Sequence, residues 1–269
     1  MFDTFRPQAD MRSDMPVIDP AAPNRTAPPS TIAFAFQRRE NPCGSQCSAC
    51  AMRRLCIAAS LTDAEAERLD TVITTWRTVA KGDVLLRAGD PFRNLYMVRS
   101  GSFKSVTSHA SGREHITAFF LPGDTLGLDG ICQEYLESDV MALEDSTVCV
   151  VPFALLETLC REVKGLQKQF HRMLSSEIVR EAELLLLVGS MPAEQRIAAF
   201  LLNISRRLRA RGFSPTDFTL RMTREDIGNY LGMKLETVSR TFSRFQREGL
   251  IRVQGKRIIL LDPEALDLL

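Results

Sequence analysis

Apolar and polar residues follow two different patterns along this chain, and each pattern predicts a different kind of element. Apolar residues recur every three or four positions over 154–188, 193–211 and 223–248, which is the spacing of amphipathic helices. Between residues 78 and 153 the pattern changes to short runs rich in β-branched residues, separated by turns that contain glycine. Short strands at such regular spacing predict an all-β sandwich or roll.

The order of these patterns predicts an α+β fold class with several successive parts. The first part contains six of the thirteen prolines and shows no sustained periodicity, so it is expected to be disordered. The predicted parts are a disordered arm over 1–40, a cysteine-rich loop over 41–60, an N-terminal β-roll over 61–155, a long dimerisation helix over 156–190 and a C-terminal winged helix–turn–helix over 191–269.

The predicted dimerisation helix carries a long apolar stripe of the kind that pairs with a second copy. Its members are Val163, Leu166, Phe170, Leu174, Ile178, Leu185 and Val188. Glu181 interrupts the stripe between Ile178 and Leu185, so in a parallel dimer two of these carboxylates would approach each other. The alternative is a Glu181 side chain that tilts outward into solvent.

A helix–turn–helix is predicted near the C-terminus, where Thr223 to Asp226 begin a short helix and Gly232 makes a tight turn. The second helix, from Leu235 to Glu248, presents four polar residues at its start, where a recognition helix reads bases. These residues are Glu236, Thr237, Ser239 and Arg240. The expected phosphate contacts are Arg244, Arg247, Lys256 and Arg257, and residues 251–261 are expected to form a β-hairpin wing. A helix–turn–helix used only for protein contacts is the alternative.

Four cysteines lie within fourteen residues, at positions 43, 47, 50 and 56, with small residues between them. The spacing of Cys47, Cys50 and Cys56 suits three ligands of one metal ion or cluster, with a fourth ligand elsewhere. Thiolates bind zinc and iron–sulfur clusters alike. A disulfide or reactive surface thiols are the plainer alternatives. Cys149 lies in a predicted strand, where a lone cysteine is most often a small buried apolar residue.

Composition and charge narrow the classes of protein that are expected. The net charge is +1 over 269 residues, so contact with nucleic acid must depend on a local basic patch. The chain contains seven cysteines and begins without a basic and apolar leader, which favours the reducing cytoplasm. The longest apolar run, Leu184 to Val188, is far shorter than the roughly 20 residues that span a bilayer. We therefore expect a cytoplasmic protein without a membrane partner.

In several motifs the chain resembles the CRP/FNR family of bacterial transcription regulators, and in its cysteine spacing it resembles the oxygen-sensing FNR branch. The similar segments are Cys43 to Cys56, Arg99-Ser-Gly101, Pro122-Gly-Asp124, Ser146-Thr-Val-Cys149, Ala193-Glu-Gln-Arg196, Arg211-Gly-Phe-Ser-Pro215, Met222-Thr-Arg224, Asp226 to Gly232 and Glu236-Thr-Val-Ser-Arg240. The resemblance implies a regulator rather than an enzyme. It also implies that the roll is a jelly roll similar to cyclic-nucleotide-binding domains.

The resemblance further implies a [4Fe–4S] cluster whose ligands are Cys47, Cys50, Cys56 and Cys149, and it makes Cys43 dispensable. Without oxygen the cluster is expected to promote dimerisation and DNA binding, and oxygen is expected to destroy it and release the DNA. The expected partners are a second copy of the chain, double-stranded DNA with TTGAT-like half-sites, and RNA polymerase. Cys132 and Cys160 have no counterpart in the resemblance and are expected to serve packing, with Cys132 in reserve as the fourth ligand.

The resemblance also gives Ile178 and Glu181 a role as a dimer switch. Glu181 occupies the position of an acidic residue, an aspartate by expectation, whose repulsion keeps cluster-free members of the family monomeric. Two alternatives to the oxygen sensor remain, namely a zinc-stapled or cyclic-nucleotide-type regulator that responds to another ligand, and an iron–sulfur electron-transfer enzyme. No nucleotide-binding glycine loop supports the enzyme. Glu137 precedes Ser138 where cyclic-nucleotide receptors carry an arginine, and its carboxylate would repel phosphate, so no cyclic nucleotide is expected.

Overall fold

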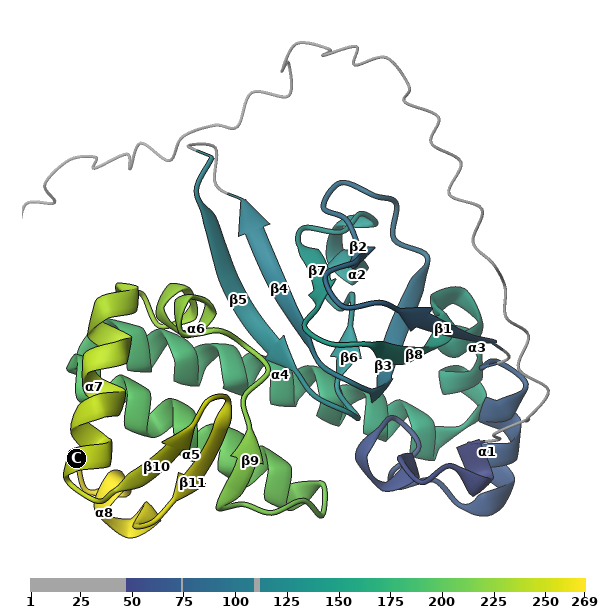
Figure 1. Ribbon diagram of the computed structural model, residues 1–269. Helices are drawn as coiled ribbons and strands as arrows, with labels where there is room; N and C mark the ends of the chain where they lie inside the picture. Colours follow the sequence, from purple (N-terminus) through teal and green to yellow (C-terminus); the bar gives the residue numbers. More distant parts are fainter. Residues whose placement is uncertain (1–46, 74, 109–111) are drawn as a thin grey trace, which may run out of the picture. The chain divides into compact units, whose positions relative to one another are not determined.

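The computed structural model describes residues 47–73, 75–108 and 112–269, all of which belong to one compact unit (Figure 1). The predicted arm over 1–40 and Cys43 lie outside the described residues. Among the described residues, no helix is both long enough and apolar enough to cross a membrane.

Two four-stranded antiparallel sheets form the roll, as the strand pattern predicts (Figure 1). One sheet has the order β1-β8-β3-β6 and the other has the order β2-β7-β4-β5. Alternate apolar side chains such as Val98, Phe103 and Val148 are buried in the core of the roll. The strands are β1 (Thr75–Val79), β2 (Val84–Leu86), β3 (Asn94–Ser100), β4 (Phe103–Ser108), β5 (Glu114–Phe120), β6 (Thr125–Leu126), β7 (Asp139–Ala142) and β8 (Ser146–Pro152).

The cysteine segment contains two short 3-10 helices and leads into a capped α-helix. Thr62 and Glu65 form a capping box, in which each side chain accepts a hydrogen bond from the backbone N–H of the other residue. This box fixes the start of α1 directly after the last cysteine of the segment. The elements are η1 (Cys47–Ala49), η2 (Arg53–Leu55) and α1 (Asp63–Asp70).

The single helix expected over 154–188 is two helices, α3 (Phe153–Glu162) and α4 (Lys164–Ser190). Val163 separates them with extended backbone angles, φ −110° and ψ 97°, and its side chain is buried in the apolar cluster beneath the cysteine segment. The break comes two residues before Gly165, in a stretch without proline. A short helix, α2 (Gly130–Gln133), lies between strands β6 and β7.

The C-terminal part confirms the predicted helix–turn–helix and wing. α6 begins after a capping box between Thr223 and Asp226, and Gly232, with φ 65°, follows at the turn before α7. β10 and β11 form the wing around Gly255, and the unpredicted β9 adds a third strand to their sheet. Together with the roll and the long helix α4, these elements confirm the α+β fold class. The elements are α5 (Ala193–Ala210), β9 (Asp217–Thr219), α6 (Arg224–Tyr230), α7 (Leu235–Arg247), β10 (Ile251–Gln254), β11 (Arg257–Leu260) and α8 (Pro263–Asp267).

Candidate functional site

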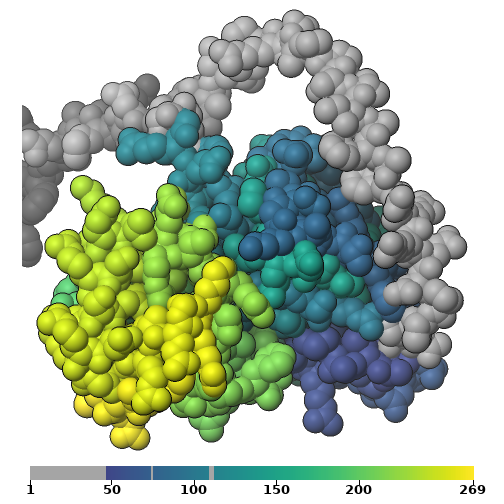
Figure 2. Space-filling view, viewed as in Figure 1, coloured from purple at the N-terminus to yellow at the C-terminus, as the bar shows by residue number. Residues whose placement is uncertain are grey.

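The cysteine segment is fastened to α1 by a carboxylate at the end of that helix. Asp70 accepts a hydrogen bond from the backbone N–H of Cys47 and one from the hydroxyl of Ser48, the latter at 3.2 Å. Both bonds hold η1, which carries the first described cysteine of the segment. The segment lies at the molecular surface beside the roll, in purple in Figure 2.

Arg53 ties the middle of the same segment to the start of α1. Its Nη1 donates to the Ser48 carbonyl at 3.2 Å and to the Asp63 carboxylate at 2.6 Å, and its Nη2 donates to the Leu61 carbonyl at 2.7 Å. The guanidinium therefore joins residues on both sides of the loop that contains Cys50 and Cys56. Neither Arg53 nor Asp70 was predicted from the sequence, because neither lies at a spacing that relates it to the thiols.

The four predicted ligands share one neighbourhood. Cys149 lies on β8 between β1 and β3, where it pairs with Trp76 and Met97. Cys47, Cys56 and Cys149 pack against one apolar cluster, which extends from β3 and β8 to α1, α3 and the start of α4. A thiolate at Cys149 would disfavour one at Cys47, and thiolates at Cys50 and Cys56 would disfavour one at Cys149.

Burial disfavours the thiolate form of these cysteines. It raises the pKa of Cys47, which the nearby Asp70 carboxylate raises further, and it raises the pKa of Cys149 to about 11 against the opposing effect of Arg99. Burial also raises the pKa of Cys56. Within the described residues, no group of three or more His, Cys, Asp or Glu side chains is arranged to hold one metal ion.

The remaining described cysteines differ in exposure. Cys132 is exposed on α2. Cys160 is buried in α3, where its side chain joins the apolar cluster beneath the cysteine segment. The packing role expected for Cys160 agrees with this burial, whereas the packing role expected for Cys132 is wrong because Cys132 is exposed. The reserve role of Cys132 as the fourth ligand stays a prediction.

The recognition helix α7 turns its polar start outward, in the yellow-green region of Figure 2. Val238, Phe242 and Phe245 are buried beneath it, as the apolar pattern predicts. Three of the four predicted base-reading side chains are exposed and Thr237 is half-buried. In the part of the chain that the structure describes, no hydrogen bond or ion pair engages the side chains of Glu236 and Arg240.

The residues expected to contact phosphate are held in different ways. Arg244 pairs with Glu194 at the start of α5 and with Glu248, at 2.7 Å, while Arg257 pairs with Asp217 at 2.6 Å. The Lys256 ammonium donates to a backbone carbonyl. Arg247 is exposed. Two of these four cations are therefore already neutralised by carboxylates of the same chain.

Helix α4 presents an apolar face that the described residues leave uncovered. The side chains of Ile178 and Leu185 are 67% and 75% exposed, and Val179 and Leu186 beside them are exposed too. At about 100° per residue, Ala182 lies at the centre of this face and Glu181 lies at its edge. The predicted role of Glu181 in the dimer seam stays a prediction.

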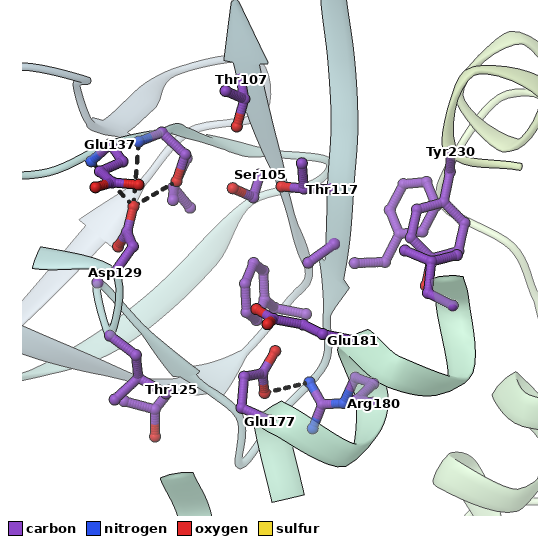
Figure 3. Close-up of a pocket in the computed structure, with 18 of the residues that line it drawn as sticks. Ser105, Thr107, Thr117, Thr125, Asp129, Glu137, Glu177, Arg180, Glu181 and Tyr230 are labelled. Carbon is purple, nitrogen blue, oxygen red and sulfur yellow. Dashed lines mark hydrogen bonds and ion pairs between the residues drawn. The ribbon is translucent and has the colours of Figure 1, made fainter. Parts of the chain in front are cut away.

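Glu181 also lines a pocket of about 230 Å³ between α4 and the roll. Figure 3 shows Glu177, Arg180 and Glu181 projecting from α4 toward the strands, opposite Asp129 and Glu137. Asp129 accepts hydrogen bonds from the backbone N–H groups of Glu137 and Ser138 and from the Ser138 hydroxyl. Carboxylates thus outnumber the arginines that line this pocket, a charge balance that disfavours phosphate.

The turn at Pro122 to Asp124 contacts both the cysteine segment and α5. A side chain at Gly123 would lie 2.8 Å from Cβ of Leu55, so only glycine permits this approach. Asp124 is buried and pairs with Arg207 at 2.5 Å and with Arg211 at 2.7 Å. Burial alone would raise the pKa of Asp124, but these two arginines and Arg180 bring it below its usual value.

Comparison with known proteins identifies the family. Residues 76–163 match the model of the cyclic nucleotide-binding domain, and residues 195–269 match the Crp-like helix-turn-helix domain. The anaerobic regulatory protein of Haemophilus influenzae is 45% identical over 83% of this chain and 87% of its own length. The fumarate and nitrate reduction regulatory protein of Escherichia coli is 43% identical over 83% of this chain and 90% of its own length.

A solved structure agrees with these relatives. The structure of FixK2 from Bradyrhizobium japonicum matches with a TM-score of 0.67 and 31% identity, over 72% of this chain and 96% of that one. The fold and the relatives together define a transcription regulator with a jelly-roll domain and a DNA-binding helix–turn–helix. The chain belongs to the CRP/FNR family. Members of this family are DNA-binding regulators that act as dimers rather than enzymes.

Proposed function

We propose that this chain is an oxygen-responsive regulator that dimerises and binds DNA when a [4Fe–4S] cluster is bound, and releases DNA when oxygen removes the cluster. One observation carries the proposal. Cys47 and Cys56 pack against the same apolar cluster as Cys149, and Cys50 lies between them in the chain, although about a hundred residues separate these three cysteines from Cys149. Relatives named for anaerobic regulation and for fumarate and nitrate reduction support a role in anaerobic metabolism.

The donor set suits this cofactor. In a cubane cluster each thiolate bonds a different iron, so the four sulfurs stand farther apart than the ligands of a single ion. All four proposed ligands are thiols, and three of them, Cys47, Cys56 and Cys149, pack against the same apolar side chains. The positive iron centres would also offset the cost of burying thiolates.

Cys47, Cys50, Cys56 and Cys149 would hold the cluster. When bound, it supplies an oxygen-labile link between the cysteine segment and β8. Asp70 and Arg53 hold the segment against α1, and Leu55 packs against the turn at Gly123. A shift of the segment would therefore change the contact of Leu55 with the turn at Gly123, and through this turn it would act on the ion pairs of Asp124 with Arg207 and Arg211.

Dimerisation and DNA binding depend on helices α4 and α7. In the dimer, Ile178 and Leu185 bury their exposed side chains against the partner and offset the repulsion between the two Glu181 carboxylates. The two α7 helices then enter major grooves about 34 Å apart. Glu236, Thr237, Ser239 and Arg240 read TTGAT-like half-sites, and RNA polymerase is the partner at the promoter.

The test compares protein purified without oxygen before and after exposure to air. We expect about four iron and four sulfide per chain, visible absorption that bleaches in air, and loss of both dimer and DNA binding on bleaching. Cys149→Ala should lose the iron, whereas Cys43→Ala and the exposed-cysteine control Cys132→Ala should keep it. Stoichiometric zinc without sulfide would refute the proposal, and a cluster that survives Cys149→Ala would reassign the fourth ligand.

A further inference from the structure

Arg99 lies at the Cys149 side of the cysteine neighbourhood, stacked on an aromatic ring. Its guanidinium carbon is 3.9 Å from the centroid of the Trp76 ring. Stacking of this kind holds a guanidinium in place, and Trp is the aromatic residue that binds cations best. The arginine is half-buried at the end of β3 and the tryptophan lies on β1, so the stack bridges two strands.

The strand register places this stack beside Cys149. Trp76 of β1 and Met97 of β3 both pair with Cys149, one from each side of β8. Directly paired residues of antiparallel strands carry Cβ atoms about 4.5–5.5 Å apart on the same face. Arg99 follows Met97 by two residues, at the point where the pairing of β3 with β8 shifts. Its contact with Trp76 brings the guanidinium to the face that carries the Cys149 thiol.

Charge around the four thiols is unevenly distributed. The Asp70 carboxylate lies beside Cys47, whose backbone N–H donates to it. At the opposite end, the Arg99 guanidinium is stacked on Trp76, the cross-strand neighbour of Cys149. A guanidinium stays protonated at any physiological pH, so this positive charge is permanent.

We propose that Arg99 is a positioning residue for the cluster, whose guanidinium, held on the Trp76 ring, offsets negative charge at Cys149 and slows loss of the cluster in air. The inference rests on the proposed function. A cubane core with four thiolate ligands is an anion, and the charges and hydrogen bonds around its sulfurs tune such a cluster. Arg99 itself bonds no iron, so its removal should leave cluster assembly possible and change how long the cluster lasts.

Trp76 provides a local readout because it is the only tryptophan in the chain. A visible-absorbing cluster bound at Cys149 would quench its emission, since Trp76 is the direct cross-strand neighbour of that residue. Emission should therefore rise in step with the loss of visible absorption. The two signals together separate loss of the cluster from general unfolding, which would also shift the emission to longer wavelength.

The experiment uses the full chain, purified without oxygen, as wild type, Arg99→Gln, Arg99→Lys and Arg87→Gln. Arg87 lies just after β2, in the other sheet, and its removal changes net charge equally. Outer-shell partners of metal sites contribute about 10- to 100-fold, so Arg99→Gln should shorten the half-life in air about 10-fold. Arg99→Lys keeps the charge but loses the planar stack, so its half-life in air should lie between those of wild type and Arg99→Gln. The half-life of Arg87→Gln should match that of wild type.

The outcomes distinguish failure of the proposed role of Arg99 from failure of the proposed oxygen sensor. Wild type and Arg99→Gln with equal cluster content and equal half-lives would overturn the role of Arg99 and leave the oxygen sensor intact. Wild type without iron and sulfide would overturn the oxygen sensor and this inference together. If Arg99→Gln does not fold, Trp76→Leu carries the test. It releases Arg99 from the ring and should also shorten the half-life, and an unchanged half-life would overturn the proposal.

Discussion

At the scale of single residues, two of the three arginines of the recognition helix differ in whether a carboxylate of the same chain pairs with them. Arg240 projects from the start of α7 and meets no carboxylate in the described part of the chain. Arg244, one helical turn later, is already paired with Glu194 and Glu248. A free guanidinium near the start of a recognition helix can form a bidentate contact with guanine, whereas a paired one must first give up its carboxylates.

We therefore expect Arg240→Ala to weaken binding to DNA at one base position by about 1 to 3 kcal/mol. A panel of duplexes, each altered at one base pair of a TTGAT-like half-site, measures this discrimination at fixed salt. Arg244→Ala is the matched control, and its effect should be smaller and similar for all sequences. A loss for Arg240→Ala that is uniform over the panel, with a shallower dependence on salt, would instead make Arg240 a phosphate contact.

At the scale of elements, α4 has two faces with different neighbours. One face carries Glu177, Glu181 and Leu184 and lines the pocket of the roll (Figure 3). The other face, centred on Ala182, carries the exposed side chains of Ile178 and Leu185. Glu181 and Glu183 lie about 100° on either side of Ala182, so both flank the apolar face symmetrically.

Glu181→Ala should raise the dimer fraction of the cluster-free protein. Removal of one like-charge contact near a surface contributes about 1 kcal/mol, which is about a fivefold change in the dimerisation constant. Sedimentation at several concentrations measures it, with Glu183→Ala as the control at the mirror position. If neither substitution changes the dimer fraction, the Glu181 carboxylate faces the roll pocket in solution and exerts no repulsion on a partner.

Local periodicity predicts elements well where neighbours in sequence are also neighbours in space. The helix–turn–helix and the helix start at Thr223 depend on residues three or four positions apart, and the wing depends on a short hairpin. The structure has these elements where the pattern puts them. Periodicity did not predict the break at Val163, because apolar residues continue at helical spacing across it, while the Val163 side chain is buried in the apolar cluster.

The site was harder to predict than the elements, for the same physical reason. Cys149 looks like an ordinary strand residue, and only its pairing across β8 brings it near a segment about a hundred positions earlier. Family resemblance suggested it as a ligand, whereas its spacing did not. Arg53 and Asp70 lie beside the thiols without belonging to any motif, because their positions depend on the packing of α1. Arg99 belongs to the Arg99-Ser-Gly101 motif, but the motif alone does not place it beside Cys149.

At the scale of the whole molecule, the turn at Gly123 and Asp124 joins the cysteine segment to the DNA-binding part. Leu55 lies against Gly123 on one side, and Arg207 and Arg211 of α5 pair with Asp124 on the other. The Asp124 side chain is only 8% exposed, so its charge depends on these partners for stabilisation. Removing the carboxylate would leave buried arginines without a counter-charge.

Asp124→Asn should therefore lower the free energy of unfolding at neutral pH by about 3 to 5 kcal/mol, the usual effect of breaking a buried ion pair. The folded-state pKa of Asp124 lies below its usual value because of the arginines, although burial opposes them. The stabilisation is thus fully present above the unfolded-state pKa of about 4 and disappears as pH falls through the lower folded-state value. Urea unfolding at a series of pH values should show the two proteins converging in acid.

Asp217→Asn provides the control for this prediction, because Asp217 pairs with Arg257 at the exposed edge of the wing and its pKa is likewise lowered. Exposed pairs contribute little, so this variant should unfold almost like wild type. If Asp124→Asn also unfolds like wild type at neutral pH, the Asp124 contacts do not hold the roll against α5. In that case a change in the cysteine segment would have to reach the recognition helix by other contacts, such as the Lys104–Asp226 pair between β4 and α6.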